Sequence, residues 1–136
     1  MMPDFPKPDF PYAYDVDTEL KRIRQHQAHR QIPSKQRGRL LLATWNIANL
    51  GTQQRRNSDL GLIAEIIRPF GLIAIQEVRD NYRDLKTIMG YLGNQFTAIF
   101  TDAAGNDERL AFIYDTSRVQ HRELIGELVV RKKTLA

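Results

Sequence analysis

The sequence contains no cysteine and no long run of apolar residues. Without cysteine, disulfides, thiolate catalysis and zinc sites with sulfur ligands are excluded, while the redox compartment stays open. No stretch approaches the length of a membrane-spanning helix. Residues 1–15 hold four prolines and several acids where a signal peptide needs a continuous apolar segment. We therefore expect a cytoplasmic location by default and no membrane association.

The composition is that of an ordinary soluble globular protein. The 136 residues suit a single domain, and 42% of them are hydrophobic against 26% charged. The formal net charge is +4 at pH 7. This mild excess of positive charge favours anionic partners without identifying one.

The chain divides near Gly38 into an amino-terminal arm with a basic helix, residues 1–37, and a domain over residues 38–136. The helix is expected within residues 16–33, where apolar side chains trace a thin stripe; Asp17 could cap it and Pro33 would end it. Its basic residues could form a phosphate-binding arm, but a solvated helix lying across the domain is favoured.

Two histidines in this segment, His26 and His29, are spaced to share one side of a helix. They could bind a metal together, yet no third ligand accompanies them in a polar segment. We expect both to be exposed to solvent.

Strand and helix patterns alternate after residue 38, which predicts the α/β class. Trp45 and Phe112 are expected in the core rather than stacked on a substrate. The expected strands cover residues 39–46, 72–77, 96–100, 109–115 and 123–132, and the expected helices cover residues 58–68 and 81–93.

Polar side chains stand at the ends of three of these strands. A strand–helix–strand crossover makes the first two strands parallel, so Asn46 and Glu77, which follow them, should meet at one sheet edge. Glu108 opens the strand that returns by a hairpin, and it falls on the same edge. Two carboxylates and an amide would suit a hard cation such as Mg²⁺. From spacing alone, Glu77 could equally be a solvated residue at a strand end.

Three stretches of sequence are more specific. "LLLATWNIANLG", "IAIQEVRD" and "GNDERLAFIYD" together resemble the endonuclease/exonuclease/phosphatase superfamily, and within it the deoxyribonuclease-like branch. The resemblance covers residues 39 to about 120. It implies the amino-terminal half of a four-layered α/β sandwich, with a mixed sheet and helices on one face.

The resemblance also implies roles for individual residues. Glu77 matches the glutamate that binds the catalytic divalent cation, and Asn46 matches the asparagine that helps to hold cation and phosphate. Glu108 matches a catalytic glutamate that orients the general-base histidine. Arg79 matches a residue that reaches nucleic acid, and Arg109 is a weaker candidate for substrate binding beside Glu108.

Alternatives to these roles stay open. Glu108 could be a structural hairpin residue. Arg79 could form a surface salt bridge with Asp80 or Asp84 instead of contacting a substrate. Gly71 stands where the family often has aspartate, a residue that terminates the preceding helix and does no chemistry.

The implied activity is that of a phosphoesterase dependent on Mg²⁺, or on Mn²⁺ or Ca²⁺ in its place, and a nuclease acting on DNA is favoured. The family's base histidine and other second-half motifs have no counterpart here, and His121 lies in no such motif. The chain could therefore be an inactive fragment or a binding module, or belong to a phosphatase or phosphodiesterase of the same superfamily. Alone, it is expected to associate through an apolar sheet face.

Overall fold

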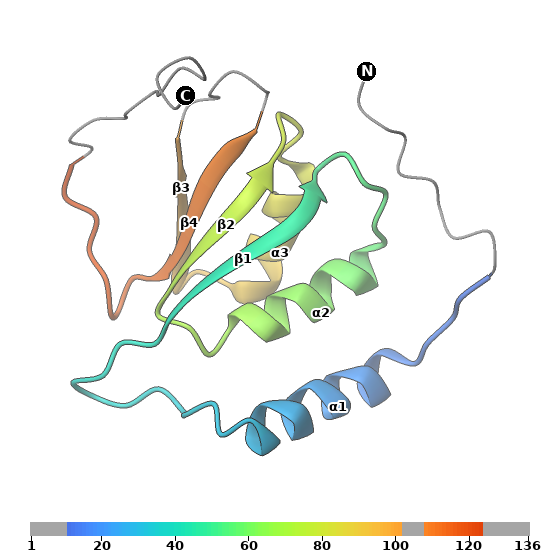
Figure 1. The fold of residues 1–136 in the computed structure, drawn as a ribbon, viewed down its shortest axis with the longest axis horizontal. Helices are drawn as coiled ribbons and strands as arrows, with labels where there is room; N and C mark the ends of the chain where they lie inside the picture. The colour runs from blue at the N-terminus through green and yellow to red at the C-terminus, as the bar shows by residue number, and fades with distance from the viewer. Residues whose placement is uncertain (1–10, 102–107, 124–136) are drawn as a thin grey trace, which may run out of the picture.

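A mixed four-stranded sheet organises the chain, with helices packed on one of its faces (Figure 1). The computed structural model describes residues 11–101 and 108–123. The elements, in chain order, are α1 (Val16–His29), β1 (Leu42–Leu50), α2 (Asn57–Ile67), β2 (Leu72–Val78), α3 (Arg83–Leu92), β3 (Phe96–Phe100) and β4 (Arg109–Asp115). This architecture confirms the predicted α/β class.

The sheet order β1-β2-β4-β3 and the strand directions decide which strand ends lie at the same edge. β1 and β2 are parallel, and β4 runs antiparallel to both of its neighbours, β2 and β3. The carboxyl ends of β1, β2 and β3 therefore lie at the same edge as the amino end of β4. The predicted hairpin between β3 and β4 is present, although residues 102–107 of its turn, like residues 124–132 of the predicted fifth strand, lie outside the described residues.

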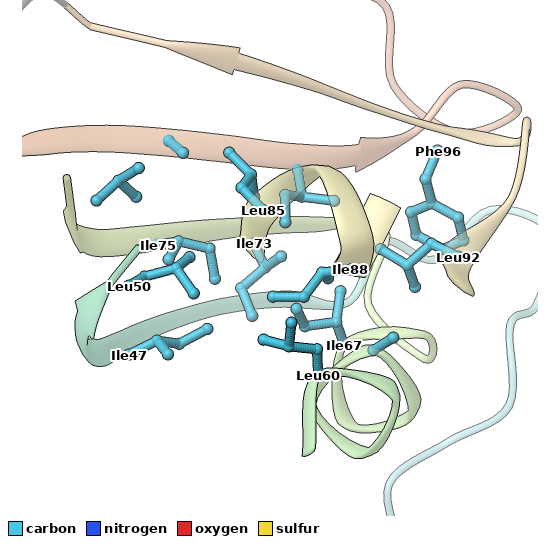
Figure 2. Packing of buried hydrophobic residues seen from close by; sticks show 14 residues of the cluster. Ile47, Leu50, Leu60, Ile67, Ile73, Ile75, Leu85, Ile88, Leu92 and Phe96 are labelled. Carbon is cyan, nitrogen blue, oxygen red and sulfur yellow. The ribbon is translucent and has the colours of Figure 1, made fainter. Parts of the chain in front are cut away.

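The core lies between the sheet and the helices α2 and α3 (Figure 2). Leu60 and Ile67 in α2, and Leu85, Ile88 and Leu92 in α3, follow helical spacing, so each helix presents one apolar stripe to the sheet. All five are at most 4% exposed. Burying such a side chain stabilises the fold by about 1.5–3 kcal/mol, so these stripes fix both helices against the strands.

Helix α1 lies against α2 and has no buried residue, which agrees with the predicted solvated helix (Figure 1). Its cap was predicted wrongly. Asp15, not Asp17, precedes the first turn, and its carboxylate accepts hydrogen bonds from the Thr18 amide at 2.8 Å and hydroxyl at 2.7 Å. His26 and His29 are exposed, as expected. Within the described residues, no helix is long and apolar enough to cross a bilayer.

The sheet face opposite α2 and α3 carries apolar side chains. Strand alternation sends Ala111 and Ile113 into the core, so Phe112 points to this open face and is only half-buried. Its predicted place in the core was therefore wrong, whereas Trp45 does pack against the core. Leu42 lies on the same open face and is 61% exposed.

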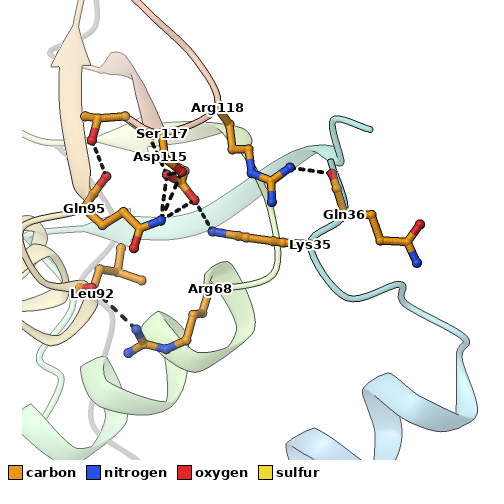
Figure 3. Close-up of polar contacts among 9 residues, drawn as sticks. Lys35, Gln36, Arg68, Leu92, Gln95, Asp115, Ser117 and Arg118 are labelled. Carbon is orange, nitrogen blue, oxygen red and sulfur yellow. Dashed lines mark hydrogen bonds and ion pairs between the residues drawn. The ribbon is translucent and has the colours of Figure 1, made fainter. Parts of the chain in front are cut away.

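A buried carboxylate fastens the loop before β1 to the end of β4 (Figure 3). Asp115 is 0% exposed and accepts hydrogen bonds from Lys35 Nζ at 2.5 Å, Ser117 Oγ at 2.6 Å and Gln95 Nε2 at 3.1 Å. Burial by itself would raise the pKa of Asp115, but these donors outweigh it and hold the pKa well below its ordinary value of 3.8.

We expect Asp115→Asn to lower the free energy of unfolding by about 2 kcal/mol at pH 7, because the buried donors lose their charged acceptor. Since the folded-state pKa is lowered, this contribution is present above the ordinary pKa and fades as the pH falls below it. Urea titrations at pH 7 and pH 3 should therefore show a smaller difference at pH 3. The control Glu19→Gln removes an exposed ion pair with Arg22 and should cost under about 0.5 kcal/mol.

We also expect the purified chain to associate through the open sheet face, because contiguous exposed apolar area favours association. Leu42→Glu should shift the sedimentation velocity distribution at micromolar concentration toward monomer. Val16→Glu, on α1 where Val16 is 39% exposed, is the matched control and should leave it unchanged. A wild-type chain that sediments as monomer throughout would contradict this expectation.

Candidate functional site

The edge where β1 and β2 end is irregular in both strands. The pairing of the two strands is regular up to Asn46 opposite Gln76, and it shifts before Leu50 pairs with Val78. Within this shift, Asn49 and Glu77 have positive φ angles of 50° and 60°. Such conformations are uncommon in residues other than glycine and often mark functional sites.

The irregularity brings Glu77 against β1, as strand order predicted. Glu77 Oε1 accepts a hydrogen bond from Asn46 Nδ2 at 2.9 Å, and Oε2 accepts one from the Asn49 amide at 3.1 Å. Asn46 and Glu77 lie inside their strands rather than after them, because β1 continues to Leu50 and β2 to Val78. Two donors from the neighbouring strand thus fix both oxygens of one carboxylate.

These donors also set the charge of Glu77. The side-chain hydrogen bond from Asn46, followed by the backbone hydrogen bond from Asn49 and the positive charge of Arg79, lowers the pKa of Glu77 below its ordinary value. Because Glu77 remains partly exposed, the ionised carboxylate faces solvent. The site therefore offers a fixed negative charge at neutral pH.

Arg79 ties Glu108 to the same site. It is 8% exposed, and its Nη2 lies 2.8 Å from Asn49 Oδ1 and 2.9 Å from Glu108 Oε1. This ion pair with Glu108 is one that the sequence did not predict for Arg79. Arg79 therefore connects Glu108, just before β4, to Asn49 in β1, whose backbone amide donates to Glu77.

Arg109 lies at the same edge but faces other partners. It forms an ion pair with Asp80, and its guanidinium lies 5.7 Å from the centre of the Tyr82 ring. Tyr82 stacks on Phe100 with ring centres 4.9 Å apart. These contacts join the start of β4 to the loop after β2.

Sequence analysis missed two residues that shape this edge, Asn49 and Gly51. Gly51 has φ 99°, and a Cβ atom there would lie 2.2 Å from the backbone oxygen of Asn81. Only glycine permits this close approach between the loops after β1 and β2. The signal was present as Asn-Leu-Gly, since asparagine and glycine favour turns at the end of a strand.

The donor set fits a hard divalent cation. Mg²⁺ is usually bound by one or two carboxylates, water and substrate phosphates, and Glu77 supplies an ionised carboxylate. Because Asn46 donates through Nδ2, its Oδ1 could serve as a second oxygen ligand. No group of three or more His, Cys, Asp or Glu suited to a metal occurs in the part of the chain that the structure describes. A cation here would therefore take most of its ligands from water and substrate.

His121 is remote from this edge in the topology. Leu72 at the start of β2 pairs with Tyr114 near the end of β4, so β4 ends at the opposite sheet edge. His121 lies six residues after Asp115 in the sequence and is exposed. Nothing in the described structure places it beside Glu77.

The fold and the site define an α/β protein with an oxygen-donor site at the carboxyl edge of its parallel strands. Comparison with known proteins adds one relative, a deoxyribonuclease from Thioalkalivibrio sp. (strain K90mix), which is 31% identical to this chain over 96 residues. The match covers 66% of this chain and 26% of the relative, so the chain spans about a quarter of that protein. No protein-family profile and no solved structure matches the chain.

We expect Asn46→Ala to raise the pKa of Glu77 toward its ordinary value, because the largest stabilisation of the carboxylate is lost. A pH titration of the Glu77 carboxyl carbon by NMR measures this directly. Gln76→Ala is the matched control: Gln76 is exposed beside Glu77 and makes no hydrogen bond to it. An unchanged pKa in Asn46→Ala would contradict the described contact.

Proposed function

We propose that this chain carries the cation-binding edge of a divalent-cation-dependent nuclease that hydrolyses DNA phosphodiester bonds. The observation that carries the proposal is the ionised Glu77 carboxylate, fixed beside Asn46 in an uncommon backbone conformation. The nuclease activity is favoured by the name of the deoxyribonuclease relative and by the motif resemblance. Mg²⁺ is the proposed cation, with Mn²⁺ or Ca²⁺ able to take its place.

Each residue at this edge has a proposed role in binding the cation and the substrate. Glu77 and Asn46 would hold the cation, which when bound supplies Lewis-acid stabilisation of negative charge on phosphate oxygens. Asn49 holds Glu77 through its amide, so the carboxylate cannot rotate freely. Arg79 donates a hydrogen bond to the Asn49 side chain and would add positive charge near a bound phosphate. A ligand set fixed in advance needs little rearrangement when substrate binds.

Glu108 is proposed as the residue that orients a histidine acting as general base. In the structure its carboxylate lies against Arg79, at the edge that also carries Glu77. His121 is not proposed as the base, because its segment follows the opposite edge of the sheet. We therefore expect the base histidine to come from outside these 136 residues, and this chain alone not to cleave DNA.

We expect Glu77→Gln to abolish cleavage of plasmid DNA in an active, longer form of the protein, and chelator to do the same. Loss of one charged cation ligand should remove several kcal/mol of transition-state stabilisation. Glu19→Gln makes the same charge change on α1 and should leave cleavage intact.

The cation site can also be tested in the chain itself. Mn²⁺ binding, followed by electron paramagnetic resonance of the free ion, should be weakened by Glu77→Gln and not by Glu19→Gln. Thermal unfolding should change little, since Glu77 faces solvent. Equal Mn²⁺ binding by all three proteins would rule out the cation role, and the chain would then be a binding module that lacks this chemistry.

A further inference from the structure

Three arginines line one groove at the sheet edge opposite Glu77. Arg37 and Arg39 come from the loop before β1, and Arg118 comes from the segment after β4. The groove encloses about 510 Å³ and continues into a second hollow of about 230 Å³ that shares Arg39 and Arg118. We call the surface formed by Arg37, Arg39 and Arg118 the basic groove.

Within the part of the chain that the structure describes, no acidic side chain neutralises the charge of the basic groove. No described residue forms an ion pair with Arg37, Arg39 or Arg118, and no carboxylate lines either hollow. The nearby Asp115 is buried and already paired with Lys35 (Figure 3). The groove thus concentrates three positive charges in a chain whose formal net charge is +4.

The fold holds this charge in place. Arg118 donates a hydrogen bond to the backbone oxygen of Gln36 (Figure 3), which joins the segment after β4 to the loop before β1. The Lys35–Asp115 pair fastens the same loop from inside. Arg37 and Arg39 themselves are exposed. Unpaired guanidinium groups on an anchored loop are suited to phosphate, which they bind through paired hydrogen bonds.

We propose that the basic groove binds the phosphate backbone of duplex DNA, as a contact surface separate from the Glu77 edge. The choice of DNA rests on the proposed nuclease function; the choice of phosphate rests on the arginines alone. Arg39 precedes Asn46 by seven residues, so the two sites are at most about 25 Å apart along the strand. A second contact at that distance would position substrate by charge without reading its sequence.

The test measures binding without cleavage. The 136-residue chain is titrated into a fluorescent 20-base-pair DNA duplex in EDTA, over a range of salt concentrations, and anisotropy is recorded. Arg37→Gln combined with Arg39→Gln should weaken binding on the order of tenfold at 0.1 M salt and reduce the slope of log K against log salt by about 1.8. Arg22→Gln combined with Arg30→Gln, two exposed arginines of the α1 region, removes equal charge and should change neither quantity.

Each other outcome overturns the proposal. Full binding by the Arg37/Arg39 variant places the contact elsewhere, and equal loss in both double variants means that net charge alone attracts DNA. If the Arg37/Arg39 variant instead loses binding to phosphatidylserine vesicles while its DNA binding is unchanged, the groove binds a membrane surface. Mn²⁺ binding at Glu77 is measured separately, so failure of the cation site and failure of the basic groove are distinguishable.

Discussion

The parallel pairing of β1 with β2 is the constraint on which the site depends. Asn46 and Glu77 are separated by 31 positions along the chain, yet parallel pairing places Asn46 opposite Gln76 and leaves Glu77 one residue beyond. Helix α2 makes this pairing possible, since it forms the crossover between the two strands and its apolar stripe packs on the sheet. If β2 ran in the other direction, the carboxylate would lie at the opposite edge, among the arginines.

The same edge is also where the backbone departs from regular strand geometry. Positive φ at a residue other than glycine costs about 1–2 kcal/mol, and the edge contains two such residues, Asn49 and Glu77. The cost is tolerated because contacts from several elements hold the conformation: the Asn49 amide on Glu77, Arg79 on the Asn49 side chain, and Gly51 against the backbone of Asn81. A regular ladder would avoid this cost, but its alternation would direct Glu77 to the sheet face opposite Asn46.

The two edges of the sheet carry opposite chemistry. At one edge, an ionised carboxylate and an amide face solvent with Arg79 buried beneath them. At the other, the acidic group Asp115 is buried and neutralised, and the arginines of the basic groove face solvent. The sheet thus separates a candidate cation site from a candidate phosphate contact, and the strands between them fix the separation.

Local patterns in the sequence determined the elements. Short apolar runs and alternation identified the four described strands, a period of 3.6 residues identified the helices, and the crossover order predicted that Asn46 and Glu77 would meet. Such features depend on neighbours along the chain. Tertiary structure decided the pairing of Arg79 with Glu108 and of Lys35 with Asp115. These pairs depend on contacts between residues that are distant in the sequence. Tertiary contacts also decided which face of β4 is buried. Alternation showed that its two faces differ, but only the packing of α2 and α3 decided that Ile113 is buried in the core while Phe112 stays on the open face.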